Sequence, residues 1–233
     1  MADLPAASRV LIVGAHPDDP DFFCGGTVAR WTAAGTVVAY VVVTSGDKGM
    51  PDPAADPLAF SRRREAEQEV SARALGVSDV TFLRLTDGEV FDTLELRARL
   101  TAEIRRFRPD LIVTHDPLTR RYRQHPDHRA VGAATLAAAF PACRLATFFP
   151  EQVAAGLAPH VVGRALLFGS DQPDTFVDIA PVFERKIAAL EQHVSQAGAF
   201  PGGLHPRLRR WAEEAGRPAG LALAEAFLAV ELE

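Results

Sequence analysis

The chain contains little cysteine and no excess of positive charge, and each absence excludes a class of protein. Only Cys24 and Cys143 occur among its 233 residues, which is too few for a disulfide framework. The formal net charge is −5, so a general nucleic-acid scaffold is disfavoured. Apolar residues make up 48% and charged residues 24%, close to the globular average, so a disordered chain is also disfavoured.

Long hydrophobic runs and a secretion signal are also lacking. No apolar run reaches the ~18–20 residues needed to span a bilayer, and the N-terminus has no basic region. No G-x-G-x-x-G follows the first predicted strand, which argues against a nucleotide-binding Rossmann protein. We therefore expect a soluble, cytoplasmic protein that binds neither nucleic acid nor a membrane.

Apolar runs alternate with helix-period stretches through the first ~140 residues. Strands are predicted at 10–15, 37–44, 80–83 and 111–114, and helices at 25–34, 58–75, 94–107 and 127–139. This alternation is typical of an α/β fold with a Rossmann-like, doubly wound, mostly parallel sheet and helices on both faces.

From about residue 145 the pattern is less regular. Strands are predicted at 165–168 and 175–179 and helices at 181–195 and 208–215, while 221–232 could form either. No internal repeat or convincing linker interrupts the chain. We therefore expect residues 1–233 to form a single domain with an irregular C-terminal part.

A cluster of acidic residues and one histidine follows the first predicted strand directly. It contains His16, Asp18, Asp19 and Asp21. Carboxylates this close repel each other, and a bound cation would relieve the repulsion. Histidine nitrogen and aspartate oxygen are ligands that suit Zn²⁺. The alternative is a polar loop in which Asp18 or Asp19 caps a helix.

A second cluster, His125, Asp127 and His128, opens the predicted helix 127–139. One histidine could bind a metal while the other transfers protons, and a carboxylate beside a histidine orients its ring and raises its pKa. The alternative is an Asp-capped helix start with solvated histidines. Because ligands of open α/β sheets bind beyond the carboxyl ends of the strands, the two clusters could meet there. Three protein ligands with an open position for water form a catalytic zinc arrangement.

The two clusters resemble the motifs of a known family. Ala15-His16-Pro17-Asp18-Asp19 with Gly25-Gly26-Thr27, and His125-Pro126-Asp127-His128-Arg129, are similar to those of the PIG-L/LmbE-like zinc-dependent N-acetylglucosaminyl de-N-acetylases. Weaker similarities extend over nearly the whole chain and include Arg64-x-x-Glu67, Lys186, His193-x-Ser195-Gln196 and Glu225.

The resemblance assigns the metal ligands. These would be His16, Asp19 and His128. The metal would be Zn²⁺, with Fe²⁺ and other divalent ions as alternatives, since two histidines and one aspartate also suit them. The resemblance further implies that Arg64 and Asp87 contact the sugar conjugate.

The same resemblance assigns the catalytic residues. Asp18 would be the general base that takes a proton from the metal-bound water. His125 would stabilise the oxyanion or protonate the leaving amine, and Asp127 would orient and tune its histidine neighbour.

The chain departs from the family pattern at two places. Many members have Glu after the two aspartates, where this chain has Pro20, and Asp21 would then take the supporting part of that Glu. Some members have Tyr two residues before the first histidine of the second motif, where this chain has Arg123, preceded by Tyr122.

Three residues outside the motifs have competing interpretations. Cys24 is interpreted as a buried small side chain rather than a ligand. His115 follows a strand and would either support the metal site or serve as an ordinary buried histidine. His193 would either line the pocket or lie on a helix surface.

We therefore predict a zinc-dependent hydrolase that removes the N-acetyl group from a small N-acetylglucosamine-type conjugate. The family analogy also allows a homo-oligomer. Two alternatives stay open. One is a metal-dependent esterase or amidohydrolase of another small substrate, and the other is a non-catalytic sugar-binding homologue.

Overall fold

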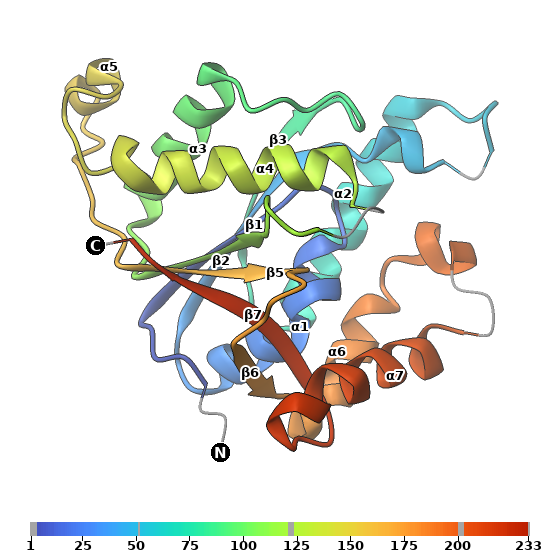
Figure 1. Cartoon of the computed structure of the whole chain (residues 1–233). Coiled ribbons are helices and arrows are strands. Elements are labelled where there is room, and N and C mark those ends of the chain that lie inside the picture. Colours follow the sequence, from blue (N-terminus) through green and yellow to red (C-terminus); the bar gives the residue numbers. More distant parts are fainter. Residues whose placement is uncertain (1–3, 51, 121–123, 200–202, 233) are drawn as a thin grey trace.

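The computed structural model describes residues 4–50, 52–120, 124–199 and 203–232. In this part of the chain, seven strands form one sheet in the order β3-β2-β1-β4-β5-β7-β6 (Figure 1). They are β1 Arg9–Gly14, β2 Val37–Thr44, β3 Asp79–Leu85, β4 Leu111–His115, β5 Arg164–Phe168, β6 Thr175–Asp178 and β7 Ala224–Glu231. The first five are parallel, and β7 runs antiparallel to both β5 and β6. The predicted α/β fold with a mostly parallel sheet is confirmed.

Helices cover both faces of the sheet. One face carries α1 Asp19–Ala33, α2 Pro57–Ala74, α6 Phe183–Leu190 and α7 Leu204–Gly216, and the other carries α3 Leu94–Phe107 and α4 Pro126–Ala137. The alternation of side chains along β1 divides the core accordingly: Val10 and Ile12 pack under α1, whereas Leu11 and Val13 pack under α3 and α4. Both faces of the central strands are therefore removed from water.

Four segments differ from the sequence prediction or decide between its alternatives. Helix α1 begins at Asp19 rather than at 25, with Pro20 in the first turn, where a missing N–H costs little. Helix α6 ends at Leu190, and Val194–Ala199 form a separate 3₁₀ helix. The ambiguous segment 221–232 contains strand β7, because it pairs with both β5 and β6. The short helix α5 Pro150–Ala154 was not predicted.

Helix α1 is kinked at Cys24, whose φ of −140° and ψ of 18° are not helical. Just beyond the kink, the N–H groups of Gly26 and Thr27 donate to the Glu225 carboxylate at 2.9 and 2.7 Å. The same carboxylate pairs with the Lys186 ammonium, and both side chains are buried. A kink interrupts the helical hydrogen bonds, so a carboxylate there supplies the missing acceptors. The Glu225–Lys186 pair thus fixes the direction in which α1 leaves the end of β1.

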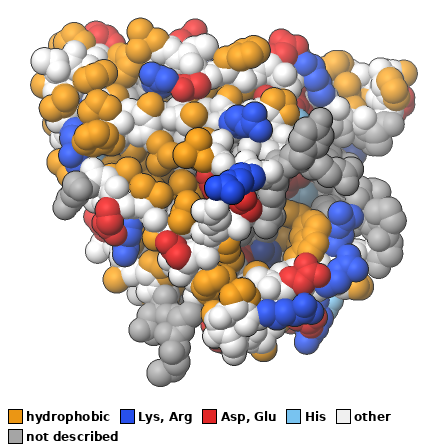
Figure 2. Space-filling model, viewed as in Figure 1, with side chains coloured by type: hydrophobic (Ala, Val, Ile, Leu, Met, Phe, Trp, Pro, Cys, Tyr) orange, Lys and Arg blue, Asp and Glu red, His pale blue; other side chains and the backbone are white. Residues whose placement is uncertain are grey.

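The surface seen in Figure 2 is divided by chemistry. Hydrophobic side chains gather at the upper left, and charged side chains are more frequent at the lower right, where Figure 1 places α7. Across the described residues, no helix is both long enough and apolar enough to cross a membrane.

Candidate metal centre

The two histidine–aspartate clusters meet at one edge of the sheet. From β3 to β1 the strand numbers fall along the sheet, and from β1 to β4 and β5 they rise, so the strand order reverses between the parallel strands β1 and β4. The carboxyl ends of these two strands frame the crevice where open α/β sheets bind ligands. The first cluster follows β1, and the second opens α4 after β4. His16 and His128 are 112 positions apart in the chain, yet their Nδ1 and Nε2 atoms lie 3.2 Å apart.

Asp19 completes a group of three candidate ligands with His16 and His128. Their ligand atoms all lie within 4.8 Å of one another. One Asp19 oxygen is 3.4 Å from His16 Nδ1, and the other is 3.4 Å from His128 Nε2. Two imidazole nitrogens and one carboxylate converging in this way match the donor set of a catalytic zinc site. The described residues therefore form a candidate His/Asp metal site.

The second nitrogen of His16 is held by two carboxylates. Nε2 lies 3.1 Å from Asp87 Oδ1 and 3.3 Å from Asp127 Oδ2. Asp127 is itself fixed, because its oxygens accept from the N–H groups of Gly88 and Val90 at 2.7 and 3.2 Å. A carboxylate on the outer nitrogen of a ligating histidine fixes its tautomer and makes the inner nitrogen a better donor.

The charge around His16 calls for a cation. Burial lowers the pKa of His16, but hydrogen bonds to Asp127, Asp19 and Asp87 outweigh burial and raise that pKa from 6.5 to about 12. Three carboxylates around one buried ring thus require a positive charge, which a proton or a divalent ion can supply. The carboxylate of Asp127 lies closer to His16, at 3.3 Å, than to its chain neighbour His125, whose Nδ1 is 3.9 Å away.

Asp18 and Asp19 are adjacent but have opposite pKa shifts. Burial raises the pKa of Asp18, although the Arg64 guanidinium partly offsets this effect. Burial would also raise the pKa of Asp19, but His128 and His115 outweigh it and hold that pKa well below the usual range. Environments that push two carboxyl pKa values apart often mark a division of roles at an active site. Asp19 suits a permanently charged ligand, and Asp18 suits a proton acceptor.

Helix α2 holds Asp18 in place. Asp18 has φ of 99°, in the left-handed region that non-glycine residues rarely adopt. Its N–H donates to Gln68 Oε1 at 2.7 Å, and its carboxylate accepts from Arg64 at 3.1 Å. Arg64 and Gln68 are four residues apart, so they share one face of the helix. The sequence interpretation missed Gln68, and this i, i+4 spacing is the signal that could have indicated it.

The two terminal nitrogens of Arg64 are bound by protein groups, whereas its buried Nε has no hydrogen-bond partner among the described residues. It is buried, and it donates to the carbonyl oxygens of Gly46 and Pro17 in addition to Asp18. Gly46 has φ of 64°, and a Cβ there would lie 2.3 Å from the Arg64 guanidinium. The predicted sugar contacts, Arg64 and Asp87, therefore lie against Asp18 and His16 respectively, at the wall of the metal centre.

His125 lies at the mouth of the centre, with 41% of its side chain exposed. Its Nδ1 accepts from the N–H of Asp127 at 3.2 Å, so the neutral ring carries its proton on Nε2. Burial, followed by the nearby His16 and His128, lowers the pKa of His125. Its Nε2 lies 4.0 Å from Asp87 Oδ1, so the ring faces the same space as that carboxylate.

His115 contacts two of the three candidate ligands, Asp19 and His128. Its Nε2 lies 3.2 Å from Asp19 Oδ2, and its ring stacks on His128 with centroids 3.9 Å apart. Burial is the main cause that lowers the pKa of His115 to about 4, so the ring is neutral at ordinary pH. A neutral, stacked ring orients His128 without adding charge beside the metal position.

Of the two departures from the family pattern, the structure describes the one at Pro20 and Asp21. Asp21 Oδ2 accepts from Gln68, Ser71 and His193 at 2.7, 2.6 and 2.9 Å, and not from the three candidate ligands. Asp21 therefore supports Gln68, which in turn holds Asp18. The other departure, Arg123 with Tyr122, lies outside the described residues.

Comparisons with known proteins show the family to which the chain belongs. The family model described as PIG-L, GlcNAc-PI de-N-acetylase, matches residues 11–139. Diacetylchitobiose deacetylase of Thermococcus kodakarensis is 34% identical, over 93% of this chain and 81% of the relative. The 1D-myo-inositol 2-acetamido-2-deoxy-alpha-D-glucopyranoside deacetylase of Mycobacteroides abscessus is 30% identical, over 81% of each chain.

A solved structure shares the fold of the whole described chain. N,N'-diacetylchitobiose deacetylase from Pyrococcus horikoshii, complexed with its inhibitor MPG, superposes with a TM-score of 0.91 at 31% identity. The match covers 98% of this chain and 87% of that one. The fold and the paired motifs define the chain as a PIG-L-type α/β protein. It belongs to the GlcNAc-PI de-N-acetylase (PIG-L) family and is a deacetylase, a hydrolase of C–N amide bonds, and the resemblance stated from the motifs is confirmed.

Proposed function

We propose that this protein is a zinc-dependent deacetylase that removes the N-acetyl group from an N-acetylglucosamine-type conjugate. The observation that carries the proposal is the convergence of His16, Asp19 and His128 beside Asp18, in a chain of this family. The ligand set favours zinc, and Fe²⁺ is the alternative metal. When bound, the metal would polarise the amide carbonyl and lower the pKa of a water molecule.

Asp18 is the proposed general base. Its raised pKa suits a group that accepts a proton during turnover and releases it afterwards. Its side chain is 27% exposed, so substrate and water can reach the carboxylate. Arg64 and Gln68 hold it in one orientation, which reduces the entropy lost on reaching the reactive geometry.

His125 is the proposed proton donor to the leaving amine, or the group that stabilises the oxyanion. Stabilising the oxyanion needs an N–H directed at the substrate, and the hydrogen bond at Nδ1 leaves the proton of the neutral ring on Nε2. Donating a proton to the amine needs the imidazolium form, which the lowered pKa of His125 disfavours at neutral pH. Asp127 and Asp87 keep His16 oriented, and Asp87 also lies near His125, where it can accept a hydrogen bond from a sugar hydroxyl. Arg64, which is bound to Asp18, forms part of the wall of the candidate metal centre.

The relatives support the proposed substrate class. One is named for diacetylchitobiose and another for a glucosaminyl-inositol, and both substrates contain N-acetylglucosamine. We therefore propose that the substrate is a small N-acetyl sugar conjugate. The Asp87 carboxylate, 4.0 Å from the partly exposed His125 ring, offers a charged acceptor for one of its hydroxyl groups.

The test is release of acetate and free amine from N-acetylglucosamine, N,N'-diacetylchitobiose and a glucosaminyl-inositol. We expect release that stops after chelation and returns on adding zinc, together with about one metal ion per chain in the active preparation. Simple esters serve as the contrasting substrates, since preference for them would support the esterase alternative. Bound zinc without acetate release from any N-acetyl sugar would contradict the proposal and favour a non-catalytic binding protein.

A further inference from the structure

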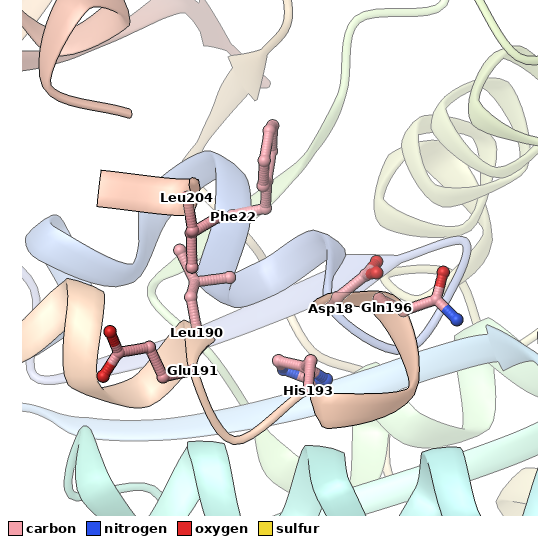
Figure 3. A pocket seen from close by; sticks show the side chains of 7 residues that line it. All are labelled: Asp18, Phe22, Leu190, Glu191, His193, Gln196 and Leu204. Atoms are coloured by element: carbon pink, nitrogen blue, oxygen red, sulfur yellow. The ribbon is translucent and has the colours of Figure 1, made fainter. Parts of the chain in front are cut away.

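A cavity of about 170 Å³ lies beside Asp18, outside the metal centre. It is formed where the start of α1 meets the end of α6, the following 3₁₀ helix and the start of α7. Figure 3 shows its two sides: Phe22, Leu190 and Leu204 on one, and Asp18, His193 and Gln196 on the other. Asp18 is thus shared between this cavity and the metal centre.

We propose that this cavity receives the acyl group of the substrate, and that the enzyme therefore accepts N-acyl groups longer than acetyl. The inference rests on the proposed deacetylase function. Hydrolysis of a longer amide is the same reaction: the C–N bond breaks, water supplies oxygen to the carboxylate product, and the amine leaves protonated.

The amide carbon carries two substituents besides its oxygen, and these decide which part of the substrate would enter the cavity. The nitrogen substituent carries the sugar and must reach the proton donor His125, which lies on the Asp87 side of the centre. Asp18 must approach the water that attacks the carbon. We assign the remaining substituent, the acyl group, to the cavity that Asp18 also lines, between α6 and α7.

The size of the cavity exceeds the need of an acetyl group. An engineered cavity of about 150 Å³ lined by apolar side chains is large enough to bind benzene. A cavity of about 170 Å³ therefore holds a chain of roughly six carbon atoms, whereas acetyl would place one methyl group there. Glu191 also lines it and is exposed, so the cavity reaches the surface.

The chemistry of the wall favours an acyl chain over a second sugar ring. Phe22 packs edge-to-face against Trp211, with ring centroids 5.2 Å apart, which keeps the aromatic wall in place. The polar side is partly committed to the protein, because His193 Nε2 lies 2.9 Å from Asp21. On the apolar side, the hydroxyl groups of a sugar would lie against Phe22, Leu190 and Leu204 without hydrogen-bond partners, at a cost in desolvation.

The experiment measures kcat/KM for amine release from N-acetyl-, N-propionyl-, N-butyryl- and N-hexanoyl-glucosamine. We expect the wild-type values for the first three to lie within about tenfold of one another. Leu204→Trp fills the cavity and should lower the butyryl-to-acetyl ratio by about 10- to 200-fold, the effect of one or two methylene groups in a tight pocket. Leu204→Ala should shift the preference towards hexanoyl. Leu145→Trp, at a surface position that does not line the cavity, is the matched control and should leave the ratio unchanged.

Three results would overturn the inference. The first is a wild-type enzyme that cleaves acetyl but cleaves propionyl and butyryl more than about a thousandfold more slowly. The second is an unchanged butyryl-to-acetyl ratio in both Leu204 variants. The third is a selective loss of diacetylchitobiose hydrolysis relative to N-acetylglucosamine in Leu204→Trp, which would assign the cavity to a second sugar. In each of these results acetyl is still released, whereas failure of the deacetylase proposal would give no acetate from any substrate.

Discussion

His16 Nδ1 lies 3.2 Å from His128 Nε2, at the carboxyl ends of two neighbouring parallel strands. Two ring nitrogens at this distance can share one proton, or they can both donate a lone pair to one cation. Asp19, 3.4 Å from each of them, supplies the negative charge that favours the cation. This contact between distant segments is the basis of the proposed chemistry.

Replacing His16 should abolish metal binding. We expect His16→Ala to lower the zinc content of the purified protein by at least about tenfold, since one of three protein ligands is lost. Metal analysis of dialysed protein is the measurement. His205→Ala, an exposed histidine that contacts Glu184 of α6, is the control and should retain zinc. Equal zinc in the His16 variant and the wild type would defeat the ligand assignment.

Replacing Asp127 should weaken metal binding without abolishing it. Asp127→Asn removes the charge that orients His16, and partners of this kind typically contribute about 10- to 100-fold in metal affinity. Competition with a chromogenic chelator measures the change. Asp171→Asn, at an exposed position, is the control. An unchanged affinity would mean that Asp127 serves only the amides of Gly88 and Val90.

Replacing Asp18 should separate turnover from metal binding. Asp18→Asn keeps the shape of the side chain but removes the proton acceptor, so kcat should fall by about 10²–10⁴-fold. The zinc content should match that of the wild type, because Asp18 is not a proposed ligand. Acetate release and metal analysis on the same preparation decide the outcome. A variant with wild-type kcat would exclude Asp18 as the base.

The His193–Asp21 pair should make stability depend on pH. Burial lowers the pKa of His193, but its hydrogen bond to Asp21 outweighs burial and raises the pKa above 6.5. The protonated ring therefore stabilises the fold fully below pH 6.5, and this contribution is lost as the pH rises through the folded-state pKa. Urea unfolding at pH 6 and pH 8.5 measures it. His193→Gln, which cannot titrate, should show a smaller loss over this interval, whereas His205→Gln should follow the wild type.

Removing Glu225 should destabilise the fold. Glu225→Ala leaves the buried Lys186 ammonium without its carboxylate, and breaking a buried pair in this way typically costs about 3–5 kcal/mol. The free energy of unfolding in urea is the measurement, and Glu231→Ala, exposed on the same strand, is the control. Adding Lys186→Met to the first variant should restore part of the loss, since no unpaired charge then stays buried. No restoration would show that the amides of Gly26 and Thr27 account for the effect.

The local sequence determined the parallel sheet and the two motifs. The β-branched run of β2 and the helix-period stretches between strands fix each element over short distances, so the order of strands and helices could be predicted. The motifs at the ends of β1 and β4 then had to share one edge, because parallel strands present their carboxyl ends together.

Only the tertiary structure decided which side chains those motifs contact. Asp127 bonds His16 across the site, and Arg64 is bound to Asp18 and two carbonyl groups. Gln68 shares a helix face with Arg64, but its bond to the Asp18 N–H depends on how α2 packs against the end of β1. The segment 221–232 contains a strand because its backbone pairs with both β5 and β6. Spacing along a chain fixes which residues share an element, but hydrogen-bond partners from different elements depend on how those elements pack.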